Sequence, residues 1–156
     1  MIRCIVRFVT AAAPPFMKNG FVVWCDTTRD AVIIDPGDEV EELLGAIRAK
    51  RLNLRHILLT HAHLDHVTGV AQAKGEFDVP IWLHADDLFL YKAAVEQGRM
   101  FGLQVAQPPP VDRFFLAQSR DHSGAQRGWL ANAESALKTE RGRAWLLSEP
   151  GRNALL

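Results

Sequence analysis

The chain has 156 residues, of which 48% are hydrophobic and 23% are charged, an ordinary composition for a soluble protein with one hydrophobic core. Its 18 basic and 18 acidic side chains cancel, so the overall charge provides no long-range attraction for nucleic acid or for an anionic membrane. No run of about 18 apolar residues is present, so the sequence predicts no membrane-spanning helix.

Three short apolar runs near the beginning of the chain predict strands. They cover residues 2–9, 21–25 and 31–34, and they are rich in β-branched and other apolar side chains. Residues 10–19 contain two adjacent prolines and predict a loop. The third strand is expected to end at the Asp35–Gly37 turn, because the proline in this turn lacks the N–H that a central strand needs.

The segment after this turn predicts an amphipathic helix. Asp38 is expected to cap its N-terminus, with Glu41 as the acidic partner of a capping box. Apolar residues then recur at three- and four-residue steps, which is the spacing of one buried helical face. These residues are Val40, Leu43, Leu44 and Ile47.

The middle of the chain alternates strands with helices. Residues 57–59 predict a short strand, and a helix is expected over about residues 66–74. Residues 79–83 predict a strand near a sheet edge, because they contain a proline, and residues 85–97 predict a further helix. This alternation predicts an α/β domain over residues 1–117.

The composition changes after residue 117. Residues 118–156 contain few β-branched residues and no convincing strand. We therefore predict a second segment, a divergent C-terminal tail over 118–156 that is either helical or disordered. In the helical alternative, the apolar spacing places a helix over residues 129–141.

The start of the chain and its two cysteines predict the cellular compartment. The first nine residues are interrupted by two arginines and lack the long apolar core of a signal peptide. Cys4 and Cys25 both lie in strand-like apolar runs, and we expect them to be reduced, packed thiols. The sequence therefore predicts a cytoplasmic protein.

Three imidazoles and one carboxylate follow the strand at 57–59 within six residues. A loop that leaves a strand alternates its side chains, so His61 and His63 can point the same way and chelate one metal ion. Asp65 and His66 come after a turn, at the start of the next helix, and can face a second ion. Imidazole and carboxylate donors suit zinc, and also iron or manganese. The run therefore predicts a metal site.

The run THAHLDH at residues 60–66 resembles the signature of the metallo-β-lactamase fold. The resemblance extends back through residues 31–37 and the helix after them, and forward through Gly69 and residues 79–84. It covers roughly residues 1–117. It is closest to the glyoxalase II-like branch, the hydroxyacylglutathione hydrolases, which hydrolyse thioesters such as S-lactoylglutathione.

The resemblance implies an αββα sandwich built from two similar halves. This chain would hold the N-terminal half, a mixed sheet with helices on one face. His61 and His63 would bind the first metal, and Asp65 and His66 the second, with one or two zinc ions, or iron or manganese in their place. The implied reaction is hydrolysis of a small-molecule thioester or related ester by a metal-bound hydroxide. Asp65 would be catalytic, because it would orient the attacking water or accept its proton.

The sequence departs from the family in its second half. The family carries a third histidine in a Thr-Pro-Gly-His-like turn, then a bridging aspartate and a last histidine, and this chain has no such turn. His122 lies at about the distance of the third histidine, in a context that does not match, and Asp121 is a weaker candidate for the bridging ligand. We therefore expect a truncated or frame-shifted product, in which His122, a partner chain or nothing replaces the missing ligands.

Half of a sandwich leaves one apolar face of its sheet without the partner sheet. An exposed apolar patch of that size favours association. We expect the chain to form a homo-oligomer through this face, to be poorly stable, or to cover the face with residues 118–156. No nucleic acid or membrane partner is expected.

Three functions are compatible with these residues. The first is the metal-dependent, thioesterase-like hydrolase, and the second is a catalytically inactive remnant that binds metal weakly or not at all. The third is an iron-dependent oxidoreductase on the same fold, similar to a persulfide dioxygenase. The same four residues can serve the first and the third, so the sequence does not separate them. A true β-lactamase is disfavoured, because no export signal is present.

Overall fold

The computed structural model describes residues 5–115 of the chain. In this part, six strands form one mixed sheet in the order β1-β2-β3-β4-β5-β6. The strands β1, β2 and β3 are antiparallel neighbours, and β3 to β6 run parallel to one another. The strands are β1 (Val6–Ala13), β2 (Lys18–Cys25), β3 (Asp30–Ile34), β4 (Asn53–Leu58), β5 (Ile81–His84) and β6 (Arg113–Phe115).

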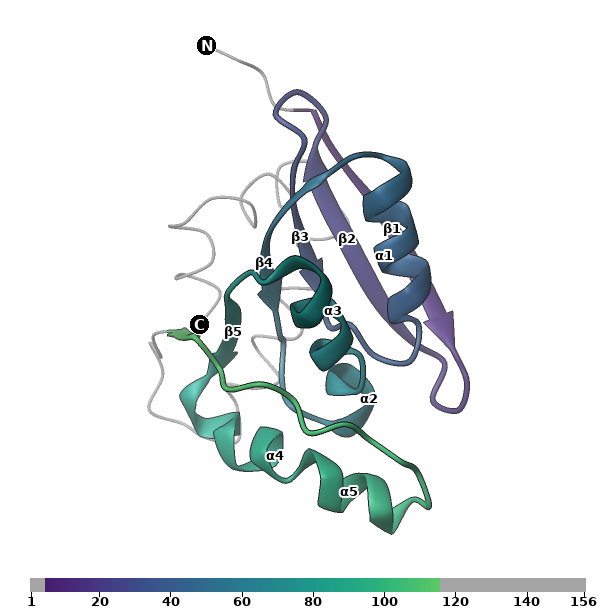
Figure 1. Cartoon of the computed structure of the whole chain (residues 1–156), viewed down its shortest axis with the longest axis vertical. Coiled ribbons are helices and arrows are strands. Elements are labelled where there is room, and N and C mark those ends of the chain that lie inside the picture. Colours follow the sequence, from purple (N-terminus) through teal and green to yellow (C-terminus); the bar gives the residue numbers. More distant parts are fainter. Residues whose placement is uncertain (1–4, 116–156) are drawn as a thin grey trace.

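Helices connect the parallel strands, because neighbouring parallel strands need a crossover connection. They are α1 (Val40–Ala49), α2 (Leu64–Val67), α3 (Val70–Phe77), the 3-10 turn η1 (Ala85–Asp87), α4 (Leu88–Lys92) and α5 (Ala94–Met100). Figure 1 shows α1, α2 and α3 on one side of the sheet, with α4 and α5 along its lower end. The predicted α/β class, a mixed sheet with helices on one face, is confirmed.

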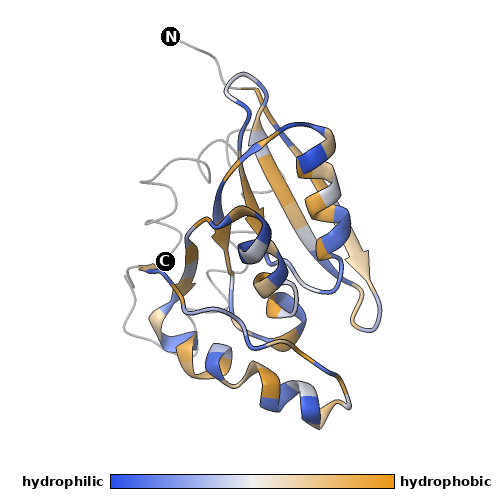
Figure 2. Cartoon of the chain, in the orientation of Figure 1, coloured by the Kyte–Doolittle hydropathy of each residue, from blue (hydrophilic) through white to orange (hydrophobic). Residues whose placement is uncertain are grey.

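The sheet is apolar on both faces, because its strands alternate between two buried sets of side chains. Figure 2 shows the strands as mostly hydrophobic, whereas α1 carries both hydrophobic and hydrophilic residues. The first face packs against the helices and includes Val22, Ala31, Ile33, Ile57 and Ile81. The second face is also buried and includes Val23, Val32, Ile34, Leu58 and Trp82. The expected covering of this face by 118–156 falls outside the described residues, as does the helix predicted over 129–141.

Two details of the sequence-based prediction are wrong for local reasons, and a third is confirmed. Residues 10–13 belong to β1 and not to a loop, because β1 pairs along its whole length with β2. Helix α1 is preceded by Glu39, which makes no side-chain capping bond, so the predicted Asp38 cap is absent. The strand after Pro80 lies near an edge as predicted, since β5 pairs with β4 and with β6, the last strand of the described sheet; Pro80 precedes β5, and its carbonyl accepts a hydrogen bond from the N–H of Ile57 at 2.9 Å.

Two further predictions need correction. The helix expected over 66–74 is two helices, α2 and α3, separated at Thr68 and Gly69. Cys25 takes part in a disulfide bond, so it is not the reduced thiol that we expected. In the described residues, no helix is both long enough and apolar enough to cross a membrane.

Candidate metal centre

The histidine run lies where strand β4 ends and the chain turns into α2. His61 is buried, with 8% of its surface exposed, whereas His63 is exposed. Ala62 and Leu64, which alternate with these histidines, are buried in the core between the sheet and the helices. The apolar residues therefore hold the loop in place, and the residues between them present imidazole rings.

All four predicted site residues meet in one cluster. The ring centroids of His61 and His63 are 4.5 Å apart, and those of His61 and His66 are 4.0 Å apart. Oδ2 of Asp65 lies 3.6 Å from Nε2 of His66. Since His63 and His66 both lie beside His61, the four side chains form one continuous cluster.

Asp35 lies behind this cluster and ties it to the end of β3. Its Oδ1 accepts a hydrogen bond from the N–H of Thr60 at 2.7 Å, and its Oδ2 accepts one from the Thr60 hydroxyl at 2.6 Å. Nδ1 of His66 lies 3.0 Å from Oδ2 of the same carboxylate. Asp35 also adopts a left-handed backbone conformation, with φ of 50°. These contacts let Asp35 orient the histidine loop from behind, as groups behind metal ligands do.

The protonation of the cluster follows from burial and from its neighbours. Burial opposes ionisation of Asp35, but the adjacent His66 and the two hydrogen bonds from Thr60 outweigh it, so the pKa of the carboxyl is lowered. Burial and the nearby His66 lower the pKa of His61 to about 4. His61 is therefore neutral at pH 7, and neutral imidazole is the form that binds metal ions.

The donor types of the cluster fit zinc or iron, but its ligand set is incomplete. Nδ1 of His66 is buried, and the Asp35 carboxylate at 3.0 Å is its polar neighbour, although this contact falls short of ideal hydrogen-bond geometry. Among residues 5–115, however, no three or more His, Cys, Asp or Glu side chains are arranged so that they could hold a metal ion. The candidates for further ligands, His122 and Asp121, lie outside the described residues.

Sequence reasoning missed two charged residues beside the Asp35–Gly37 turn. Nζ of Lys18 lies 2.6 Å from Oε1 of Glu39, and both side chains are almost entirely buried. Nothing in the sequence indicated this pair, because Lys18 lies in a segment that reads as a loop, and Glu39 is one of several acidic residues at a helix start.

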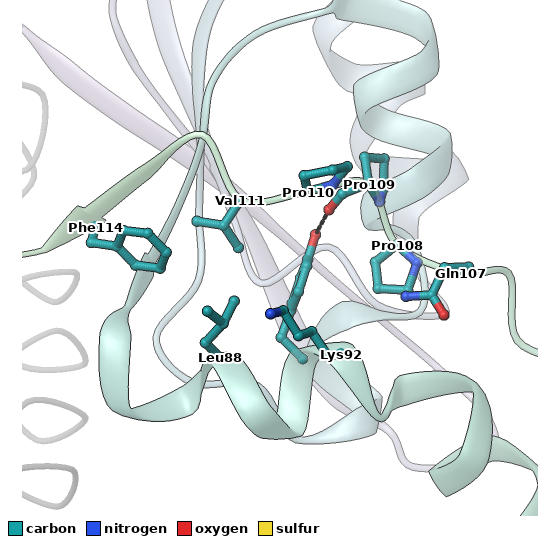
Figure 3. Close-up of a pocket in the computed structure, with 9 residues that line it drawn as sticks. Leu88, Lys92, Gln107, Pro108, Pro109, Pro110, Val111 and Phe114 are labelled. Carbon is teal, nitrogen blue, oxygen red and sulfur yellow. Dashed lines mark hydrogen bonds between the residues drawn. The ribbon is translucent and has the colours of Figure 1, made fainter.

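A separate pocket of about 360 Å³ lies between α4 and the proline-rich segment that follows α5 (Figure 3). The Tyr91 hydroxyl donates a hydrogen bond to the carbonyl of Pro109 at 2.7 Å and closes one side of the pocket. Its lining includes Leu88, Lys92 and Phe114 and no residue of the histidine run. It is therefore distinct from the candidate metal centre.

Several known proteins are similar to this chain in sequence or in structure. The hydroxyacylglutathione hydrolase GloC of Haemophilus influenzae is 43% identical over 100 residues, which cover 64% of this chain and 44% of that protein. TTHA1623, whose structure was solved in a di-iron-bound form, is 38% identical with a TM-score of 0.62, over 72% of this chain and 56% of that one. The B3 metallo-beta-lactamase BLEG-1 is 29% identical with a TM-score of 0.63, over 73% and 55% of the two chains.

The extent of these matches differs between the chain and its relatives. The chain spans less than half the length of the curated relatives that it matches. In the chain itself, residues 13–129 match the metallo-beta-lactamase superfamily. Because this match covers most of the sequence and includes the histidine run, the chain belongs to the metallo-beta-lactamase superfamily.

Proposed function

We propose that the chain carries the metal-binding loop of a metal-dependent hydrolase that acts on a small-molecule thioester of the hydroxyacylglutathione type. The observation that carries this proposal is the cluster of His61, His63, Asp65 and His66 at the end of β4, supported from behind by Asp35. The similarity to a curated relative named hydroxyacylglutathione hydrolase GloC extends over 100 of the 156 residues, a span that includes the loop, and a second relative of that name matches over 62 residues. The substrate class comes from these relatives.

His61, His63, Asp65 and His66 are the side chains that would hold the metal. A bound divalent ion supplies Lewis acidity, which lowers the pKa of water and polarises a carbonyl group. The di-iron form of a similar structure supports iron as an alternative to zinc. The remaining donors would come from outside residues 5–115 or from another chain, because those residues hold no three-donor group suited to a metal.

Within this proposal, two residues of the cluster and Asp35 behind it have separate roles. Neutral His61 offers a lone pair without first losing a proton, because its pKa is far below 7. Asp65 is a quarter exposed and is the carboxylate that would take a proton from the attacking water. Asp35, which is buried and hydrogen-bonded to Thr60, would orient His66.

A non-catalytic chain is the second candidate function. The absence of a three-donor metal group among residues 5–115 favours it. A non-catalytic chain would bind metal weakly and would not turn over thioesters, so the two candidates differ in a measurable way.

The test is hydrolysis of S-lactoylglutathione by the purified chain after loading with zinc or with iron. The hydrolase proposal expects turnover that a chelator abolishes and that Asp65→Asn lowers by about 100-fold or more. Asp86→Asn, which changes an exposed carboxylate on η1, is the matched control and should keep the native rate. Metal-loaded chain without turnover would exclude the hydrolase for this chain and support the non-catalytic candidate.

A further inference from the structure

The buried ion pair between Lys18 and Glu39 is unusual because of where it lies. The two side chains are 10% and 1% exposed, and burial of a charged pair is costly unless further hydrogen bonds satisfy both groups. Both groups have such bonds, and both bonds end on the same turn. Nζ of Lys18 donates to the carbonyl of Asp35, and Oε1 of Glu39 accepts from the N–H of Gly37 at 3.0 Å.

The space around the pair also fits its charged groups closely. A Cβ atom at Gly20 would lie 2.1 Å from Oε1 of Glu39, and a Cβ atom at Gly37 would lie 2.9 Å from Nζ of Lys18. Any side chain at these two positions would therefore displace the pair. Glu39 precedes α1, but its side chain makes no capping hydrogen bond to the helix. Its carboxylate instead accepts hydrogen bonds from Lys18 and from the N–H of Gly37.

On its other side, the turn touches the histidine loop. A Cβ atom at Gly37 would lie 2.0 Å from the carbonyl oxygen of Asp65, so the backbones of the two segments are in direct contact. The N–H of Gly69, just after α2, donates to the carbonyl of Pro36 at 3.0 Å. The carboxylate of Asp35 holds Thr60 and lies against His66. The turn is therefore placed between the ion pair and the candidate metal ligands.

We propose that Lys18 and Glu39 are positioning residues for the metal site: as a buried pair they fix the Asp35–Gly37 turn, and through it the Asp35 carboxylate behind the histidine loop. The pair touches no metal ligand side chain and acts only through the turn. This inference rests on the proposed metal-binding role of the loop, but the geometry of the turn can also be measured without metal.

The first experiment compares zinc affinity of the full chain, by chelator competition, between the native protein and a Lys18→Met/Glu39→Gln double variant. The double change removes both charges together, so no unpaired charge stays buried and the fold is expected to persist. We expect the dissociation constant for zinc to rise about 10-fold or more, the scale seen when groups behind metal ligands are lost. Should the double variant not fold, Glu39→Asp replaces it: this variant keeps both charges and shortens the carboxylate by one methylene group, so a smaller loss is expected in the same direction.

Tyr91→Phe is the matched control. It removes the hydrogen bond to Pro109 beside the separate pocket, and it therefore lowers stability without touching the turn. Its zinc affinity should equal that of the native chain. If Tyr91→Phe and the double variant weaken zinc binding equally, the effect comes from general destabilisation and the positioning role is wrong.

The second experiment follows the position of the Asp35 carboxylate in the metal-free protein. The N–H of Thr60 donates to the Asp35 carboxylate, so its proton chemical shift and its exchange with deuterium report where that carboxylate lies. We expect both to change in the double variant and to keep their native values in Tyr91→Phe. A folded double variant with native Thr60 signals and native zinc affinity would overturn the proposal. If the native chain binds no zinc, the proposed function fails, and the Thr60 signals alone decide the role of the pair.

Discussion

Asp35 combines burial, charge and a left-handed backbone in a single residue. Its carboxylate has two oxygens and receives two hydrogen bonds from Thr60, while His66 lies 3.0 Å away. A residue with positive φ is uncommon unless it is glycine or asparagine, and surrounding contacts must hold it there. The hydrogen bonds to Thr60 and the Lys18 bond to its carbonyl are such contacts.

Replacement of this carboxylate tests its importance to the fold. Asp35→Asn leaves one acceptor oxygen where two are used, so we expect the free energy of unfolding to fall by about 1–3 kcal/mol. The control, Asp30→Asn, breaks an exposed ion pair with Arg55 and should lower it by less than about 1 kcal/mol. Urea denaturation measures both. Equal losses in the two variants would contradict the role given to Asp35.

The lowered pKa of His61 predicts how stability depends on pH. The folded chain holds this imidazole with a pKa of about 4, against an ordinary value of 6.5. Between these values the unfolded chain binds a proton that the folded chain does not, so stability falls as the pH drops from 6.5 to about 4. Asp35 also has a lowered pKa, but its window lies below its ordinary value of 3.8.

The measurement is urea denaturation of the metal-free chain at pH 7 and at pH 5. His61→Gln cannot take up this proton, so its stability should change less between the two pH values than that of the native chain. An identical change in both proteins would show that His61 does not cause the pH dependence.

At the scale of elements, the sequence predicted those whose signals are local. The apolar runs predicted β2, β3 and β5, and the 3.6-residue spacing predicted α1. The strand β6 was missed, because three residues after a proline-rich stretch carry no periodic signal. The break between α2 and α3 was missed as well, because it depends on the close approach of Gly69 to the Asp35–Gly37 turn, which is a tertiary contact.

In the candidate site, too, the sequence predicts what depends on local spacing and misses what depends on tertiary contacts. The spacing of the run predicted that His61, His63, Asp65 and His66 lie close together, and they do, two in the loop after β4 and two at the start of α2. Lys18 and Glu39 are 21 residues apart in sequence, and only the pairing of β2 with β3 brings them together. Single-sequence patterns therefore identify the donors of the loop and miss the residues that hold it.

Two glycines near α3 test whether the turn and the histidine loop need their close contact. A Cβ atom at Gly69 would lie 2.5 Å from the carbonyl oxygen of Gly37, whereas one at Gly75 meets nothing within 4 Å. Gly69→Ala should therefore destabilise by about 1–3 kcal/mol through overpacking. Gly75→Ala should stabilise by up to about 1 kcal/mol, because alanine is the better helix former. Urea denaturation that finds both variants equally stable would exclude tight packing at Gly69.

At the scale of the whole molecule, the question is whether the second sheet face is covered in solution. Val22 lies on the face that packs against the helices and Val32 on the opposite face, with exposures of 0% and 1%. Val22→Thr and Val32→Thr keep shape and bury a hydroxyl, so each should cost about 1–3 kcal/mol. If the second face is bare, Val32→Thr will be nearly neutral. If it is the interface of the homo-oligomer that we propose as an alternative, the loss will depend on protein concentration.

The central claim is that the loop at residues 60–66 is a formed metal site. The measurement that tests it most directly is the metal content of the purified chain by elemental mass spectrometry, with a His61→Ala/His63→Ala double variant alongside. The account predicts about one or two zinc or iron ions per native chain and none in the variant. A native chain that is empty, and stays empty after zinc is added, would contradict it.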